Sequence, residues 1–106
     1  ANIPLPTQSQ VALPLSEPAC AVSSLAVSIA GREGCKTGIW ECAPGRFRRN
    51  VAQGEVMHFL AGSGTFQRDG EDTVYSFGAG DTVFFPPDTH GVWEIHHTLR
   101  KVYVLV

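Results

Sequence analysis

Apolar and polar residues alternate in short runs along this chain, with a period of two. Leu25, Val27 and Ile29 are large and apolar, and small residues stand between them. This alternation places the large side chains on one face, as in a β-strand with one buried side. We therefore predict a strand over residues 25–29.

Similar segments follow, each short, rich in aromatic or β-branched residues, and bounded by Gly, Pro or Asp. They cover residues 37–42, 47–51, 55–61, 64–68, 73–77, 82–85, 91–95 and 101–105. No stretch has the period of an amphipathic helix. About nine strands at this tight spacing are typical of a sandwich or barrel, so we predict an all-β domain.

The first 18 residues contain four prolines among Gln and Ser residues. Proline breaks a helix, so this segment is expected to be extended. An extended arm is stable only against another surface, such as a sheet edge of its own barrel or of a second copy. Since 106 residues suit one domain, we predict an arm over residues 1–24 and a single barrel domain over residues 25–106.

Charge and cysteine content restrict the partners and the compartment. A formal net charge of −2 gives no basic face for nucleic acid or an acidic membrane.

The three cysteines, Cys20, Cys35 and Cys42, are an odd set without CxxC spacing, so neither a disulfide framework nor a zinc site is expected. The apolar run over residues 19–30 lacks the basic flank of a signal peptide and the ~20-residue length of a membrane span. We expect a cytoplasmic protein with reduced thiols.

Two glycine-punctuated segments, residues 54–66 and 78–93, share a spacing with a known family. Six residues separate Glu55 from Gly62, and five separate Gly80 from Pro86. These gaps resemble the two motifs of the cupin superfamily. The resemblance implies a cupin-type jelly-roll (double-stranded β-helix) barrel, which the extended N-terminal arm precedes.

Cupins that bind a metal use three histidines and a glutamate from these motifs. Counting back from Glu55 places Arg48 and Asn50 at the first two histidine positions. Gly91 takes the third, and His90 misses it by one residue. Arginine brings a positive charge and no lone pair. We therefore expect no metal cofactor, with a divalent metal as the alternative.

Three finer segments narrow the resemblance. GIWECAPGRF, FGAGDTVFFPPDTHGVWE and RKVYVL are similar to the cupin family named for ureidoglycine aminohydrolase, which also includes a protein of ethanolamine utilisation. The similarity covers about residues 37–106. Ureidoglycine aminohydrolase resembles a manganese-dependent cupin, and this chain lacks the histidines of that chemistry, so its reaction is not carried over.

Glu55 is the main candidate for chemistry, since strand alternation places it on the same face as Met57 and Phe59. A carboxylate among apolar neighbours is desolvated and suits general acid or base catalysis. Arg48 would grip a substrate carboxylate or stabilise an oxyanion. The alternatives are an arginine that only neutralises Glu55, or a glutamate paired at the rim. Arg49 is expected among the solvated rim charges.

Aromatic side chains on different predicted strands are candidates for the pocket walls, namely Trp40, Trp93 and Tyr103. Each would otherwise be a core residue. His90 is either a ligand contact at the mouth of the barrel or a solvent-facing turn residue.

Three functions fit this pattern. The first is a metal-free binding cupin that takes a small carboxylate-bearing metabolite between Arg48 and Glu55. The second is a lyase, isomerase or hydrolase on a small acid or amide, with Glu55 as general acid or base. The third is a homo-oligomeric accessory subunit whose interior is only a core. In each case we expect a homodimer, since barrels of this family resemble one another in pairing through sheet edges.

Overall fold

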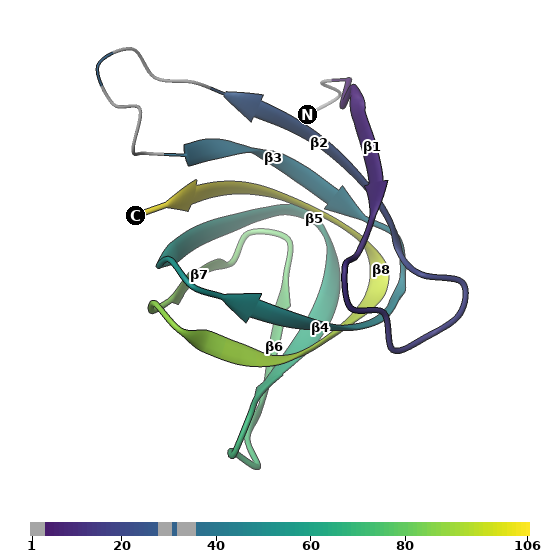
Figure 1. Cartoon of the computed structure of the whole chain (residues 1–106), viewed down its shortest axis with the longest axis vertical. Helices are drawn as coiled ribbons and strands as arrows, with labels where there is room; N and C mark the ends of the chain where they lie inside the picture. Colours follow the sequence, from purple (N-terminus) through teal and green to yellow (C-terminus); the bar gives the residue numbers. More distant parts are fainter. Residues whose placement is uncertain (1–3, 28–30, 32–35) are drawn as a thin grey trace.

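The computed structural model describes residues 4–27, 31 and 36–106, which form one antiparallel β structure. The described part contains no helix, so none there could cross a membrane. The strands are β1 Thr7–Gln10, β2 Ala21–Val27, β3 Lys36–Cys42, β4 Gly45–Val51, β5 Glu55–Arg68, β6 Val74–Gly78, β7 Thr82–Phe85 and β8 Thr89–Leu105. Figure 1 shows the strands curving around one interior. The predicted all-β fold is confirmed.

The two long strands β5 and β8 hold the barrel together. The sheet runs in the order β1-β2-β3-β8-β5-β6, while β4 pairs with the first half of β8 and β7 with the first half of β5. The β5–β8 register shifts between Phe59 and Gly64. Such bulges bend a strand without ending its pairing. Each long strand therefore passes from one side of the barrel to the other.

This bend explains the difference between predicted and observed strands. The separate segments 55–61 and 64–68 are the single strand β5, and 91–95 and 101–105 are both part of β8. Gly62 has φ 88°, and a Cβ there would collide with the Thr98 carbonyl. Sequence reasoning took this glycine as the end of a strand, whereas it allows the close approach of two strands at a bend.

Trp93 of β8 lies fully buried at the centre of an aromatic core. The Phe77 ring is 5.1 Å from its ring centroid, Phe85 is at 5.7 Å, and Phe47 stacks at 6.1 Å. Edge-to-face and stacked pairs of this kind add about 0.5–1.5 kcal/mol each beyond burial. The middle of the barrel is therefore filled by side chains.

The N-terminal arm lies on its own barrel. β1 pairs with β2 along its whole length. Further along, the Arg48 amide donates to the Leu13 carbonyl at 2.9 Å, and the Leu15 amide donates to the Arg46 carbonyl at 2.8 Å. β2 begins at Ala21, so the predicted boundary after residue 24 falls inside a strand. Residues 28 and 29 of the predicted strand 25–29 lie outside the described part, and the homodimer stays a prediction.

Candidate functional site

Glu55 opens β5 and points into the barrel. Its side chain is 1% exposed, and Met57 and Phe59 on the same face are equally buried. Its neighbours across the sheet are Phe85 of β7 and Leu105 of β8. The prediction of an inward glutamate is confirmed, while its chemical role stays a prediction.

Lys101 of β8 is the first partner of Glu55. Its Nζ donates to Glu55 Oε2 at 2.7 Å and lies 3.3 Å from Met57 Sδ. The lysine is 1% exposed and sits in one cross-strand row with Trp40 and Phe59. Sequence reasoning missed this residue. The signal was present, because strand alternation puts Lys101 on the same face as Tyr103, among apolar positions.

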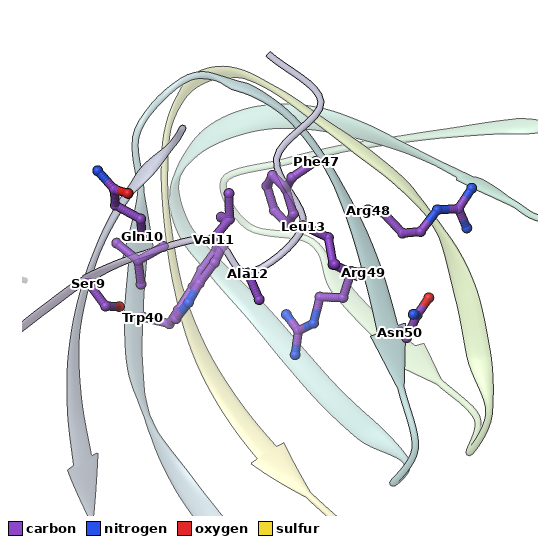
Figure 2. A pocket seen from close by; sticks show the side chains of 11 residues that line it. Ser9, Gln10, Val11, Ala12, Leu13, Trp40, Phe47, Arg48, Arg49 and Asn50 are labelled. Atoms are coloured by element: carbon purple, nitrogen blue, oxygen red, sulfur yellow. The ribbon is translucent and has the colours of Figure 1, made fainter. Parts of the chain in front are cut away.

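Arg49 of β4 is the second partner, since its Nη2 donates to Glu55 Oε1 at 2.7 Å. The prediction that Arg48 faces Glu55 is wrong. Arg48 turns to the opposite face, where its Nη1 lies 2.7 Å from Asp69 Oδ2. Figure 2 shows the two arginines leaving β4 in opposite directions, with Arg49 directed towards Trp40. The expected solvated rim position of Arg49 is likewise wrong, because its side chain is only 25% exposed.

The exchange of Arg48 and Arg49 in the prediction has a simple geometric cause. The first cupin motif allows three or four residues between its second histidine and its glutamate, and the placement of Arg48 and Asn50 at the histidine positions assumes four. A spacing of three places Arg49 and Val51 at the histidine positions instead. Because side chains alternate along a strand, a shift by one residue moves the whole set to the other face.

Two residues in the second motif segment, Asp88 and Gly91, occupy positions that favour glycine. Asp88 has φ 61°, a left-handed conformation that glycine adopts most easily. Gly91, at the third histidine position, is buried, and a Cβ there would lie 2.6 Å from the Phe66 ring. An aromatic ring therefore fills the space next to that position.

Aromatic rings enclose the two cations. Lys101 Nζ lies 4.7 Å from the Trp40 ring centroid, 5.2 Å from Trp93 and 5.9 Å from Tyr103. The Arg49 guanidinium lies 6.0 Å from Trp40 and 5.9 Å from Trp93. Contacts at these distances stabilise a cation through the ring quadrupole. Tyr103 fits there because its partner across the sheet is Gly38, where a Cβ would lie 2.8 Å from the Tyr103 hydroxyl.

Two cavities adjoin this cluster. One of about 210 Å³ is lined by Trp40, Arg49, Glu55, Lys101, Tyr103 and Leu105. A second, of about 300 Å³, lies under the arm and shares Trp40 and Arg49 with the first. Figure 2 shows this second cavity with Val11 and Leu13 of the arm at its edge. Trp40 and Arg49 therefore lie at the boundary between the two cavities.

The other predicted site residues divide into two groups. Trp40 and Tyr103 line the smaller cavity, while Met57 and Trp93 are fully buried beside Lys101. Asn50 and His90 are exposed and lie opposite each other in the β4–β8 pairing, away from Glu55. Asn50 lines the cavity under the arm.

Burial lowers the pKa of Lys101 to about 7, and the positive charge of Arg49 acts in the same direction. The Glu55 carboxylate opposes both effects and raises the pKa of the lysine. The net direction follows from the removal of water around an ammonium group.

The cluster does not fit a divalent metal. Both carboxylate oxygens of Glu55 already accept from a cation, and Arg49 and Lys101 would repel a metal ion. In the described part of the chain, no group of three or more His, Cys, Asp or Glu side chains could hold an ion.

Residues 30–103 match the model of the EutQ-like cupin domain family. This chain belongs to that family. Over 63 residues it is 33% identical to a pyrimidine/purine nucleoside phosphorylase of Pseudomonas putida, a match that covers 59% of this chain and 66% of that relative. The match therefore spans slightly less than two thirds of the curated relative.

Solved structures show the same fold. The Clostridium difficile EutQ protein superposes on this EutQ-like cupin with a TM-score of 0.71 at 18% identity, over 84% of this chain and 70% of that one. A DUF861 family protein of unknown function from Pseudomonas syringae gives 0.81 at 19% identity, over 100% and 45%. A DUF1255 protein of unknown function from Acidithiobacillus ferrooxidans gives 0.65 at 18% identity, over 92% of each chain.

The lowered pKa of Lys101 predicts a pH-dependent stability. Between about pH 7 and pH 10 the unfolded chain holds a proton on this lysine that the folded EutQ-like cupin releases. The unfolded state binds more protons in this window, so the free energy of unfolding rises with pH. Relative to Lys101→Met, we expect a rise on the order of 1 kcal/mol per pH unit above pH 7 and no slope below it.

Urea unfolding of both proteins at several pH values measures this difference. A constant gap between wild type and Lys101→Met from pH 6 to pH 9 would contradict the lowered pKa.

Proposed function

We propose that this protein is a metal-free binding cupin that takes a small carboxylate-bearing metabolite into the cavity beside Glu55. The observation that carries the proposal is the contact of two cations, Arg49 and Lys101, with one buried carboxylate. With both cations charged, the cluster has one positive charge in excess. A ligand anion would neutralise that charge.

Arg49 is suited to hold Glu55 and a ligand together. A guanidinium carries five N–H donors in a planar fork. Nη2 of Arg49 contacts Glu55, and the same side chain lines both cavities. A ligand carboxylate that approaches from either cavity would therefore meet a partly desolvated guanidinium, where a charge-assisted hydrogen bond is strong.

The size of the cavity limits the ligand. About 210 Å³ corresponds to roughly seven water molecules at ~30 Å³ each. A metabolite of a few carbon atoms fits this space, with Trp40 and Tyr103 as its apolar walls. Small-molecule pockets combine such walls with a few polar groups that fix orientation.

The test compares two neighbouring arginines. Acetate, propionate and lactate should raise the melting temperature of the wild type, because a ligand that binds only the folded state stabilises it. Arg49→Ala and Arg49→Lys should weaken binding of these acids by at least about tenfold, since each removes the guanidinium fork.

Arg48→Ala is the matched control, because it removes the same charge from the same strand on the opposite face. It should bind like the wild type. Equal loss in Arg48→Ala and Arg49→Lys, or no stabilisation of the wild type by any small acid, would contradict the proposal.

A second candidate is phosphorolysis of a nucleoside, favoured by the 33% identity to a pyrimidine/purine nucleoside phosphorylase. Arg49 and Lys101 offer two cations for an inorganic phosphate. The larger cavity beyond Trp40 and Arg49 would take the nucleoside. A phosphate oxygen would then attack the anomeric carbon of the sugar while the base leaves.

This candidate predicts release of free base from uridine or inosine only when phosphate is present, detected by chromatography. Arg49→Lys should lower the rate by at least about tenfold, because it removes the fork that grips phosphate. Arg46→Ala, on the same strand but lining neither cavity, should keep the rate. Base release without added phosphate, or none at all, would exclude phosphorolysis.

Three finer predictions from the sequence remain proposals. These are membership of the ureidoglycine aminohydrolase branch, a cytoplasmic location and a lyase, isomerase or hydrolase reaction at Glu55. Free, buried thiols at Cys20 and Cys42 support the cytoplasmic location. Cys35 lies outside the described residues.

A further inference from the structure

We propose that Lys101 forms a reversible imine with small 2-oxo acids or aldehyde acids that enter the cavity. This inference rests on the proposed carboxylate site and names the class of acid that the site takes. Its basis is the position of the amine, which lies in the wall of the 210 Å³ cavity and shares the Glu55 carboxylate with the Arg49 guanidinium.

The surroundings of Lys101 are those of a reactive lysine. Its side chain is 1% exposed, and the rings of Trp40, Trp93 and Tyr103 lie within 6 Å of Nζ. An amine is activated as a nucleophile when it is desolvated or placed beside another cation. Both conditions hold here, because Arg49 shares the carboxylate of Glu55. The lowered pKa of Lys101 agrees with this geometry.

The other nucleophilic side chains are less suited to attack a carbonyl. Burial raises the pKa of the Cys42 thiol to about 12, with Cys20 adding to the effect, so it does not form a thiolate near neutral pH. The chain has one other lysine, Lys36, which is exposed at the start of β3. An exposed lysine is fully solvated and lacks the desolvation that activates a buried amine as a nucleophile.

Arg49 would orient the acid for the reaction. Lys101 Nζ and Arg49 Nη2 each lie 2.7 Å from an oxygen of the same carboxylate. In a 2-oxo acid the carbonyl carbon is bonded directly to the carboxylate carbon. A ligand carboxylate held by Arg49 would bring the adjacent carbonyl into the cavity that Lys101 also lines.

The chemistry balances without an oxidant or a reductant. The lone pair of the neutral amine attacks the carbonyl carbon, and the carbonyl oxygen takes up a proton. The resulting carbinolamine loses this oxygen as water, and a C=N bond forms. One amine and one carbonyl thus give one imine and one water. Glu55, at 2.7 Å from Nζ, is placed to accept the proton of the amine and return it to the leaving hydroxyl.

Reductive trapping tests the inference on the full chain. Pyruvate or glyoxylate is added with cyanoborohydride at pH 7, which reduces an imine to a stable secondary amine. Intact mass and peptide mapping then measure labelling at each amine. We expect one adduct at Lys101, formed at least about tenfold faster than at Lys36 in the same molecule, since Lys101 is the desolvated amine.

Two controls define the role of the site. Propionate has no carbonyl and should give no adduct, and Arg49→Lys should slow labelling of Lys101 by pyruvate. Because Lys36 is compared within the wild-type chain, the experiment does not depend on whether Lys101 variants fold.

The outcomes separate the two proposals. Equal labelling of both lysines, together with stabilisation by propionate that Arg49→Lys abolishes, would overturn the imine and support the carboxylate site. No preference for Lys101 and no stabilisation by any acid would overturn both. Selective labelling of Lys101 that Arg49→Lys slows would support both.

Discussion

The structure depends on one buried carboxylate and the two cations that neutralise it. An unpaired carboxylate in a protein interior costs several kcal/mol, more than most single contacts return. Glu55 is buried to the same degree as the aromatic core and avoids this cost because Lys101 and Arg49 each donate to one of its oxygens. The three residues come from β5, β8 and β4, so the charge cluster also links the strands that frame the cavity.

The same arrangement is a poor site for a divalent metal. The barrel keeps the glutamate of the first motif, and a lysine and an arginine supply the positive charge around it. Gly91 stands at a histidine position, and the Phe66 ring occupies the adjacent space. The site therefore suits the anion binding that we propose, whereas coordination of a cation would require the loss of both ion pairs.

Much of the fold could be predicted from the sequence, because strand alternation and glycine spacing are local signals. β1, by contrast, was missed, since Thr7–Gln10 has no apolar position and forms a strand only through its pairing with β2. Glu55 was predicted to face inward by simple alternation. Arg48 was chosen over Arg49 because the motif allows two spacings, and only the register of β4 against β8 decides between them.

Lys101 shows a different limit of prediction from the sequence. Lysine is usually exposed, so the sequence alone gives little reason to pair Lys101 with a residue 46 positions away. Its place between apolar residues on one strand face was a usable hint. What the sequence could not supply is the cross-strand neighbour, since contacts between β5 and β8 depend on the bulges that set their register.

A double-mutant cycle between Glu55 and Lys101 tests the central claim most directly. Free energies of unfolding are measured for the wild type, Glu55→Gln, Lys101→Met and the double variant. The buried ion pair predicts that each single change costs about 3–5 kcal/mol and that the double variant recovers a large part of it. Additive losses, within about 0.5 kcal/mol, would show that the two side chains do not interact and would contradict the account.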